Sequence, residues 1–230
     1  MDVIHLPIEL WTLIFDLLDI KIQVRLIQLC KIIKDKIFIT DLCNIDYKFK
    51  IKINGDIIKK YPYIKRLDAR WYSAIKDQDL VGLNLIELYA SFNPKIKKIN
   101  HMTNLRKLNA SSTSCGIGDD DLMGLNLVEL NAYNNPKIKK INYMTNLRIL
   151  HASWSCGIGD DDLVGLNLVE LYASDNPKIK KINHMTNLRI LYASYNCGIG
   201  DDDLIGLNLV ELHANDNPKI KNKILDKKLP

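Results

Sequence analysis

The chain has 230 residues, of which 47% are apolar and 26% charged, so it is long enough and apolar enough to bury a core. This composition excludes a disordered protein, because disordered chains are poorer in apolar residues. The 32 basic and 27 acidic residues leave a net charge of +5, whose meaning depends on where the charges lie. The apolar stretch 4–22 contains Glu9, Asp16, Asp19 and Lys21, which excludes a membrane span there.

The N-terminus and the cysteines indicate an intracellular protein, cytoplasmic or nuclear. Residues 1–3 lack the basic region of a secretory signal. The cysteines are odd in number and include no C-x-x-C pair, which argues against a disulfide framework and against structural zinc. We therefore expect reduced thiols at all five positions, namely Cys30, Cys43, Cys115, Cys156 and Cys197.

Residues 1–44 have the pattern of an N-terminal helical domain. Pro7 suits a helix start, and the apolar residues that follow recur every four positions, at Leu10, Ile14 and Leu18. A second apolar stripe lies between residues 22 and 37. Residues 45–63 differ from both neighbours, and we expect them to form an irregular first rung or a linker.

The residue order in this N-terminal segment resembles the F-box, a helical motif that docks onto a Skp-family adaptor. The resemblance covers residues 3–40 and rests on Leu6-Pro7-x-Glu9-Leu10, on Ile14-Phe15 with Leu18, and on Leu29-Cys30-Lys31. It implies three helices and an adaptor contact formed by Leu6, Pro7, Leu10, Ile14, Phe15 and Leu18. The alternative is a helical cap that covers the open apolar end of a repeat stack.

From residue 64 onward the chain is repetitive. Gly82-Leu83-Asn84-Leu85 recurs at residues 124, 165 and 206, in steps of 42, 41 and 41 residues. Each step contains two copies of Leu-x-x-Leu-x-Ala, so residues 64–230 hold about eight units of 20 to 22 residues. The copies start at Leu85, Leu105, Leu127, Leu147, Leu168, Leu188 and Leu209, with a weaker one at Ile64.

This unit resembles the leucine-rich repeat, whose opening is L-x-x-L-x-L-x-x-N. Residues 168–176 match that opening, with Ala173 in place of the third leucine. The resemblance implies an α/β solenoid with short parallel strands on its concave face, so the whole chain would be α+β. It also implies a ladder of asparagines at the ninth unit position, formed by Asn93, Asn135, Asn176, Asn196 and Asn217. Ser155 departs from that ladder, and one extra residue among Ser111–Ser114 predicts a small bulge.

Strand periodicity supports the same arrangement. A period of two directs the first, fourth and sixth positions to one interior, which only a neighbouring unit can cover. Alanine occupies the sixth position of all eight units, so we expect little room there. Cys115, Cys156 and Cys197 recur in every second unit, near 10 Å apart at roughly 5 Å per rung, and are expected as small core residues.

Two charged runs alternate along the units. Gly-Ile-Gly-Asp-Asp-Asp, which ends at Asp121, Asp162 and Asp203, predicts capped short helices rather than calcium sites, because consecutive aspartates point apart. Asn-Pro-Lys-Ile-Lys-Lys lies in the units between them. The alternation predicts a convex face of mixed sign rather than a nucleic-acid surface. No motif in the chain indicates catalysis, a metal or a cofactor, so we expect none of them.

The concave face is where the repeats differ. Residues 127–167 and 168–208 differ at eight positions, and five of these fall at unit positions five, seven and eight, which face outward from the strand. Exposed aromatic residues are typical of protein-binding surfaces. The alternative is random drift on a tolerant face. The predicted target contacts are Tyr89, Phe92, Asn131, Tyr133, His151, Trp154, Tyr172, Tyr192, Tyr195 and His213, with Glu87, Glu129, Glu170 and Glu211 beside them.

Together the two resemblances imply an F-box protein with leucine-rich repeats, the substrate-recognition subunit of a Skp, cullin and F-box ubiquitin ligase. The expected partners are a Skp-family adaptor, through it a cullin, and a target protein, without nucleic acid or membrane. The near-identical units and the many Ile, Lys and Asn residues also resemble F-box repeat proteins of large DNA viruses. The alternative function is a non-catalytic interaction scaffold whose N-terminal helices only cap the solenoid.

Overall fold

The structure is a computed structural model that describes residues 7–29, 36–43, 45, 50, 52–71 and 73–221. Two helices come first, α1 (Ile8–Asp16) and α2 (Ile20–Leu29). The strands that follow are β1 (Asp41–Leu42), β2 (Arg66–Asp68), β3 (Glu87–Tyr89), β4 (Lys107–Asn109), β5 (Glu129–Asn131), β6 (Ile149–His151), β7 (Glu170–Tyr172), β8 (Ile190–Tyr192) and β9 (Glu211–His213). Short helical turns lie between strands: α5 (Gly55–Ile58), α6 (Asp77–Leu80), α7 (Asp119–Leu122), α8 (Asp160–Leu163) and the 3-10 turn η1 (Asp201–Leu204).

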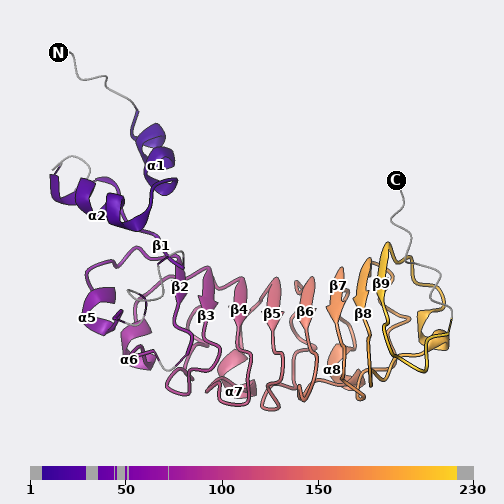
Figure 1. Ribbon diagram of the computed structural model, residues 1–230. Helices are drawn as coiled ribbons and strands as arrows, with labels where there is room; N and C mark the ends of the chain where they lie inside the picture. Colours follow the sequence, from indigo (N-terminus) through magenta and orange to yellow (C-terminus); the bar gives the residue numbers. More distant parts are fainter. Residues whose placement is uncertain are drawn as a thin grey trace.

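The nine strands form one parallel sheet whose order is the chain order, from β1 to β9. The fourth-position leucines stand opposite one another, so that Leu130 pairs with Leu150 and Leu150 with Leu171. Figure 1 shows a gently curved stack with the sheet along its inner side and α7 and α8 along its outer side. The predicted stack of short parallel strands is therefore confirmed.

The sheet begins earlier than the sequence pattern indicates. Asp41 pairs with Arg66 and Leu42 with Leu67, so β1 already belongs to the first rung. The boundary expected at residue 44 thus falls inside that rung. A strand of two residues shows no alternation, which is why periodicity could not reveal it. Asn54 caps α5 by accepting a hydrogen bond from the Ile57 amide, in the segment expected to be irregular.

The described residues before β1 contain two helices of more than one turn, α1 and α2, and the three-helix segment implied by the F-box resemblance is not confirmed. Leu6 and residues 30–35, which include Cys30 and Lys31, lie outside that part of the chain. Within the described residues, no helix combines the length and apolar character that crossing a bilayer requires.

The interior of the stack follows the predicted positions. Leu168, Leu171 and Ala173 are fully buried, as are their equivalents in most other rungs. The sixth-position alanines are buried in every rung, at Ala69, Ala90, Ala110, Ala132, Ala152, Ala173, Ala193 and Ala214. Cys115, Cys156 and Cys197 are also fully buried, and burial raises the pKa of each thiol to about 11. The expectation that they fill the core is confirmed.

The asparagine ladder is present in every second rung. The Asn176 side-chain amide donates to the carbonyls of Ala152 at 2.7 Å and Ile158 at 3.1 Å, both in the preceding rung. Asn93, Asn135 and Asn217 make the equivalent pairs of bonds. The prediction for Asn196 is wrong, because Asn196 is exposed and the next residue, Cys197, is buried instead.

The aspartate runs are structural. Asp121 accepts a hydrogen bond from the Gly118 amide and so caps α7, as predicted. Asp119 reaches the next rung, where its carboxylate accepts bonds from the backbone amides of Lys139 and Lys140 at 2.7 and 3.0 Å. Asp119 thus binds the lysine run of the next rung through neutral backbone amides. The described residues contain no group of His, Cys, Asp and Glu that could hold a metal.

Candidate binding surfaces

A row of stacked rings follows the fifth unit position on the exposed face of the sheet. His151, Tyr172, Tyr192 and His213 occupy four neighbouring strands, and their registers place them side by side. Successive ring centroids are 4.0, 4.6 and 4.1 Å apart, with planes tilted by 10° to 16°. Parallel strands at one register bring identical positions into contact, so the repeat itself creates this ring ladder.

The surroundings of this ladder favour the neutral forms of His151, Tyr172 and Tyr192. Burial raises the pKa of Tyr172 to about 12, and the Glu170 carboxylate acts in the same direction. Burial lowers the pKa of His151, against the opposing effect of Glu129 and Glu170. The Tyr172 hydroxyl donates to Glu170 at 3.1 Å, and the Tyr192 hydroxyl donates to Glu211 at 3.2 Å. The ladder therefore combines stacked aromatic rings with the carboxylates of Glu170 and Glu211.

The eighth unit position holds a second row of side chains. In the eight units from residue 64 onward, the residues at this position have a positive φ: Trp71, Phe92, Ser112, Asn134, Trp154, Asp175, Tyr195 and Asp216. Asn and Asp tolerate this conformation, but bulky side chains rarely adopt it, at a cost of order 1–3 kcal/mol. Trp154 and Tyr195 are nevertheless about half exposed there. Trp154 and Tyr195 thus present large rings to solvent from a backbone conformation that is unfavourable for them.

The charges at the third unit position differ between the two halves of the face. In the N-terminal half, Arg66 binds Asp41 and Glu87, and Lys107 binds Glu129. In the C-terminal half, Ile149 and Ile190 take the places of these cations beside Glu170 and Glu211. Arg70, held by Asp68, also lies 5.6 Å over the Tyr89 ring. The C-terminal half is thus more acidic than the N-terminal half.

The predicted target contacts lie along these two rows. Tyr89, Asn131, His151, Tyr172, Tyr192 and His213 are in the strands at position five, and Phe92, Trp154 and Tyr195 are in the turns at position eight. Tyr133, at position seven, approaches Trp154 with ring centroids 6.2 Å apart. The sequence analysis missed Trp71, whose ring stacks on Phe92. The weak repeat that starts at Ile64 places Trp71 at position eight and could have identified it.

Helix α1 presents a second candidate surface, because it is apolar on two sides. Ile8, Trp11 and Phe15 pack against the core, and Phe15 is 2% exposed. The other side carries residues at i, i+3, i+4 and i+7, and these are exposed: Leu10 by 44%, Leu13 by 62%, Ile14 by 40% and Leu17 by 87%. A helix that is apolar all round is normally covered on all sides. The outer side of α1 is therefore suited to a partner.

The expected adaptor contacts divide between these two sides. Leu10 and Ile14 lie on the exposed side, and Pro7 is exposed at the helix start. Phe15 is buried and holds α1 in place, while Leu18 is half-buried after the helix ends. Leu6 lies outside the described residues. Leu13 and Leu17, which the sequence analysis did not select, complete the exposed row.

Helices α1 and α2 are fixed to each other by a buried glutamine. The Gln23 side-chain amide donates to the carbonyls of Phe15 at 2.7 Å and Leu18 at 3.1 Å. The Phe15 carbonyl lies in the last turn of α1 and the Leu18 carbonyl just after it, so one side chain of α2 binds the end of α1. The α1 surface is thus presented on a defined two-helix unit next to the first strands (Figure 1).

A scan of the chain against protein-family models gave no match, and a search of curated proteins gave none either.

Proposed function

We propose that this chain is the substrate-recognition subunit of a Skp/cullin/F-box ubiquitin ligase, with an F-box-like segment and a leucine-rich-repeat solenoid. In this proposal α1 docks a Skp-family adaptor, the concave face holds a target protein, and the chain itself performs no chemistry. Tethering raises the effective concentration of the target near the ubiquitin-charged enzyme. Such a subunit acts inside the cell, in the cytoplasm or the nucleus.

The observation that carries the proposal is the exposed side of α1. Leu10, Leu13, Ile14 and Leu17 form one continuous row, although Phe15 already anchors the same helix to the core. A cap for the solenoid needs only the inner side. An exposed apolar patch of this kind is typical of an interaction site, and we assign it to the adaptor. Two residues of this row, Leu10 and Ile14, are among those that the F-box resemblance assigns to the adaptor contact.

The concave face supports the second half of the proposal. The two aromatic rows provide large, rigid side chains of the kind that dominate binding energy in protein interfaces. Glu170 and Glu211, flanked by Ile149 and Ile190, favour a target segment that brings hydrogen-bond donors or positive charge. The N-terminal half, where basic residues are already paired with acidic ones, favours an apolar segment next to Trp71 and Phe92.

The test is binding of the purified chain to a purified Skp-family adaptor, measured by pull-down and calorimetry. We expect the parent to bind and Leu13→Glu/Leu17→Glu to lose at least tenfold in affinity, since two charges would enter an apolar contact. The matched control is Val81→Glu/Val164→Glu, which changes two apolar residues in solenoid turns that are also more than half exposed. The control should bind as the parent does, and circular dichroism should be alike for all three proteins.

The second candidate function is an interaction scaffold outside the ubiquitin system. It is favoured by the packing of Phe15, Val24 and Ile27 against the same core as the first rungs, which is what a cap would do. Absence of adaptor binding by the parent would select this function. The concave face would then remain the binding surface.

A further inference from the structure

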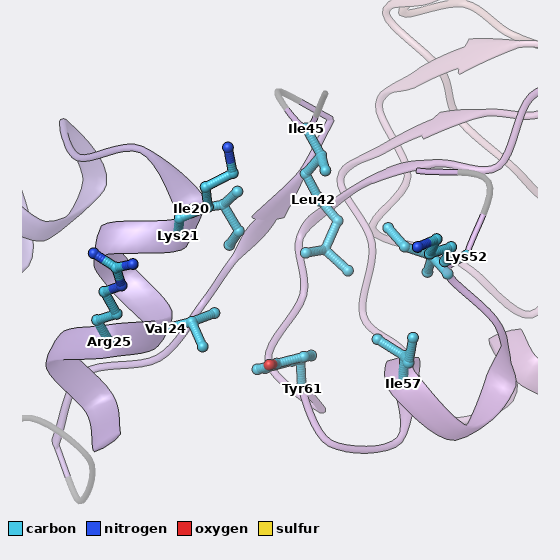
Figure 2. A pocket seen from close by; sticks show the side chains of 10 residues that line it. Ile20, Lys21, Val24, Arg25, Leu42, Ile45, Lys52, Ile57 and Tyr61 are labelled. Carbon is cyan, nitrogen blue, oxygen red and sulfur yellow. The ribbon is translucent and has the colours of Figure 1, made fainter. Parts of the chain in front are cut away.

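A cleft of about 560 Å³ lies between α2 and the first rungs of the solenoid (Figure 2). Ile20 and Val24 form its α2 side, and Leu42, Ile57 and Tyr61 form the facing side. Its volume lies in the range of small-molecule sites, roughly 300–1,000 Å³. The cleft is separate from the outer side of α1 and from the two aromatic rows.

The walls of the cleft are apolar, yet they do not close on each other. Leu42 and Ile53 are buried, whereas Ile20, Val24, Ile57 and Tyr61 are only partly buried. In Figure 2 the side chain of Val24 projects from α2 toward Tyr61 across the open space. An apolar group placed there would remove carbon surface from water on both sides, which the hydrophobic effect favours.

The charged residues that line the cleft have one sign. Lys21 and Arg25 come from α2 and Lys52 from the opposite side, and all three are exposed. Among the described lining residues there is no aspartate or glutamate. An apolar interior with basic groups on both sides complements a ligand with an apolar body and an anionic head.

We propose that this cleft binds a free single-chain amphiphile with an anionic head group. The aliphatic chain lies between α2 and Tyr61, where the walls are mainly branched aliphatic side chains, and the head group contacts Lys52. Arg25, whose side chain points away from the open space in Figure 2, adds positive charge at the rim. A cationic amphiphile would meet the like charges of Arg25 and Lys52 instead. Because the two walls belong to α2 and to the first rungs, the ligand joins the helical segment to the solenoid. This proposal does not depend on the proposed function.

The first experiment is calorimetric titration of the full chain with sodium dodecanoate below its micelle concentration. We expect saturable binding of one ligand per chain. Decanoate and octanoate should bind more weakly, by about fourfold for each methylene group removed. Dodecyltrimethylammonium, which has the same chain and the opposite charge, should not bind. Equal binding of both dodecyl compounds, or binding of neither, would overturn the proposal.

Three variants separate the cleft from nonspecific uptake. Arg25→Gln/Lys52→Gln should weaken dodecanoate binding at least tenfold, whereas the control Lys139→Gln/Lys180→Gln, at exposed lysines of the solenoid, should bind as the parent does. Val24→Trp should fill the cleft and abolish binding. Circular dichroism checks that each variant is folded. If Val24→Trp does not fold, Arg25→Gln/Lys52→Gln still tests the proposal. Unchanged dodecanoate affinity in Arg25→Gln/Lys52→Gln would contradict the inference. Binding to anionic vesicles without binding to monomeric dodecanoate would contradict it as well.

Discussion

Trp71 and Phe92 stack across two neighbouring rungs, with ring centroids 4.5 Å apart and planes 7° apart, although both residues have a positive φ. The backbone conformation is unfavourable for each of them, and the stacking restores part of that energy. Trp154 and Tyr195 adopt the same backbone conformation with φ of 62° and 58° and are about half exposed. We interpret the backbone strain at position eight as a consequence of the target-binding role that we propose for this row.

Tyr195→Gly should therefore stabilise the protein. Glycine adopts a positive φ without strain, and the exposed ring contributes little burial, so we expect a gain of about 0.5–1 kcal/mol in the free energy of unfolding. Urea unfolding followed by circular dichroism measures it. Asp216→Gly is the control, since aspartate tolerates this conformation, and its gain should be smaller. A loss of stability in Tyr195→Gly would mean that ring packing outweighs the strain.

Trp154→Ala together with Tyr195→Ala should abolish target capture while adaptor binding is unchanged. The two rings are on the concave face, far along the chain from α1, so the contacts are independent. Affinity capture from a cell extract, followed by the adaptor titration, measures both. Equal loss of the two activities would contradict this division of labour.

Asn176→Ala should destabilise the protein by about 2–4 kcal/mol. The change leaves the buried carbonyls of Ala152 and Ile158 without the amide that now donates to both. Asn196→Ala is a control of the same chemistry at the same unit position, because Asn196 is exposed. Its effect should stay within about 0.5 kcal/mol. Urea unfolding measures both variants. Similar losses in the free energy of unfolding would show that the buried asparagine stabilises its rung no more than the exposed one does.

The free energy of unfolding should fall as the pH rises from about 9 to 11. Burial raises the pKa of Cys115, Cys156 and Cys197 to about 11, so the unfolded chain releases these protons at lower pH than the folded chain does. Each thiol contributes at most about 1.4 kcal/mol per pH unit in that window, and its contribution to stability is fully present below it. Urea unfolding at several pH values measures the slope. A variant with alanine at the three positions should show a shallower slope, and an equal slope would rule the thiols out.

The sequence predicts most of the solenoid because its repeat has a physical cause. Buried leucines at positions one and four and alanine at position six are required in each rung, so the pattern survives in all of them. Asn196 shows the limit of this reasoning. It is the same residue type at the same unit position as Asn176. In its rung, however, the side chain that enters the interior is the next one, that of Cys197. A single-unit pattern cannot show which of two turn types is present.

The candidate surfaces were predicted only in part. The strand period correctly places Tyr172 and Tyr192 on one face, but it contains nothing about the stacking distance between their rings. In α1, helical spacing selects Phe15 and Leu10 equally well, and only packing separates the buried side from the exposed one. The cleft beside Val24 depends on how α2 meets the first rungs, and that arrangement leaves no local pattern in the sequence.

The Asp119 carboxylate accepts hydrogen bonds from the backbone amides of Lys139 and Lys140 in the next rung. The same contact recurs two rungs later, from Lys180 and Lys181 to Asp160, so the repeating structural unit consists of two rungs. Loss of a single rung would bring two turns of the same kind together and leave carboxylates without their amides. Loss or gain of two rungs would preserve every contact. A gene that changes in steps of 41 or 42 codons can thus lengthen the binding face by about 10 Å at a time while the rest of the molecule stays the same.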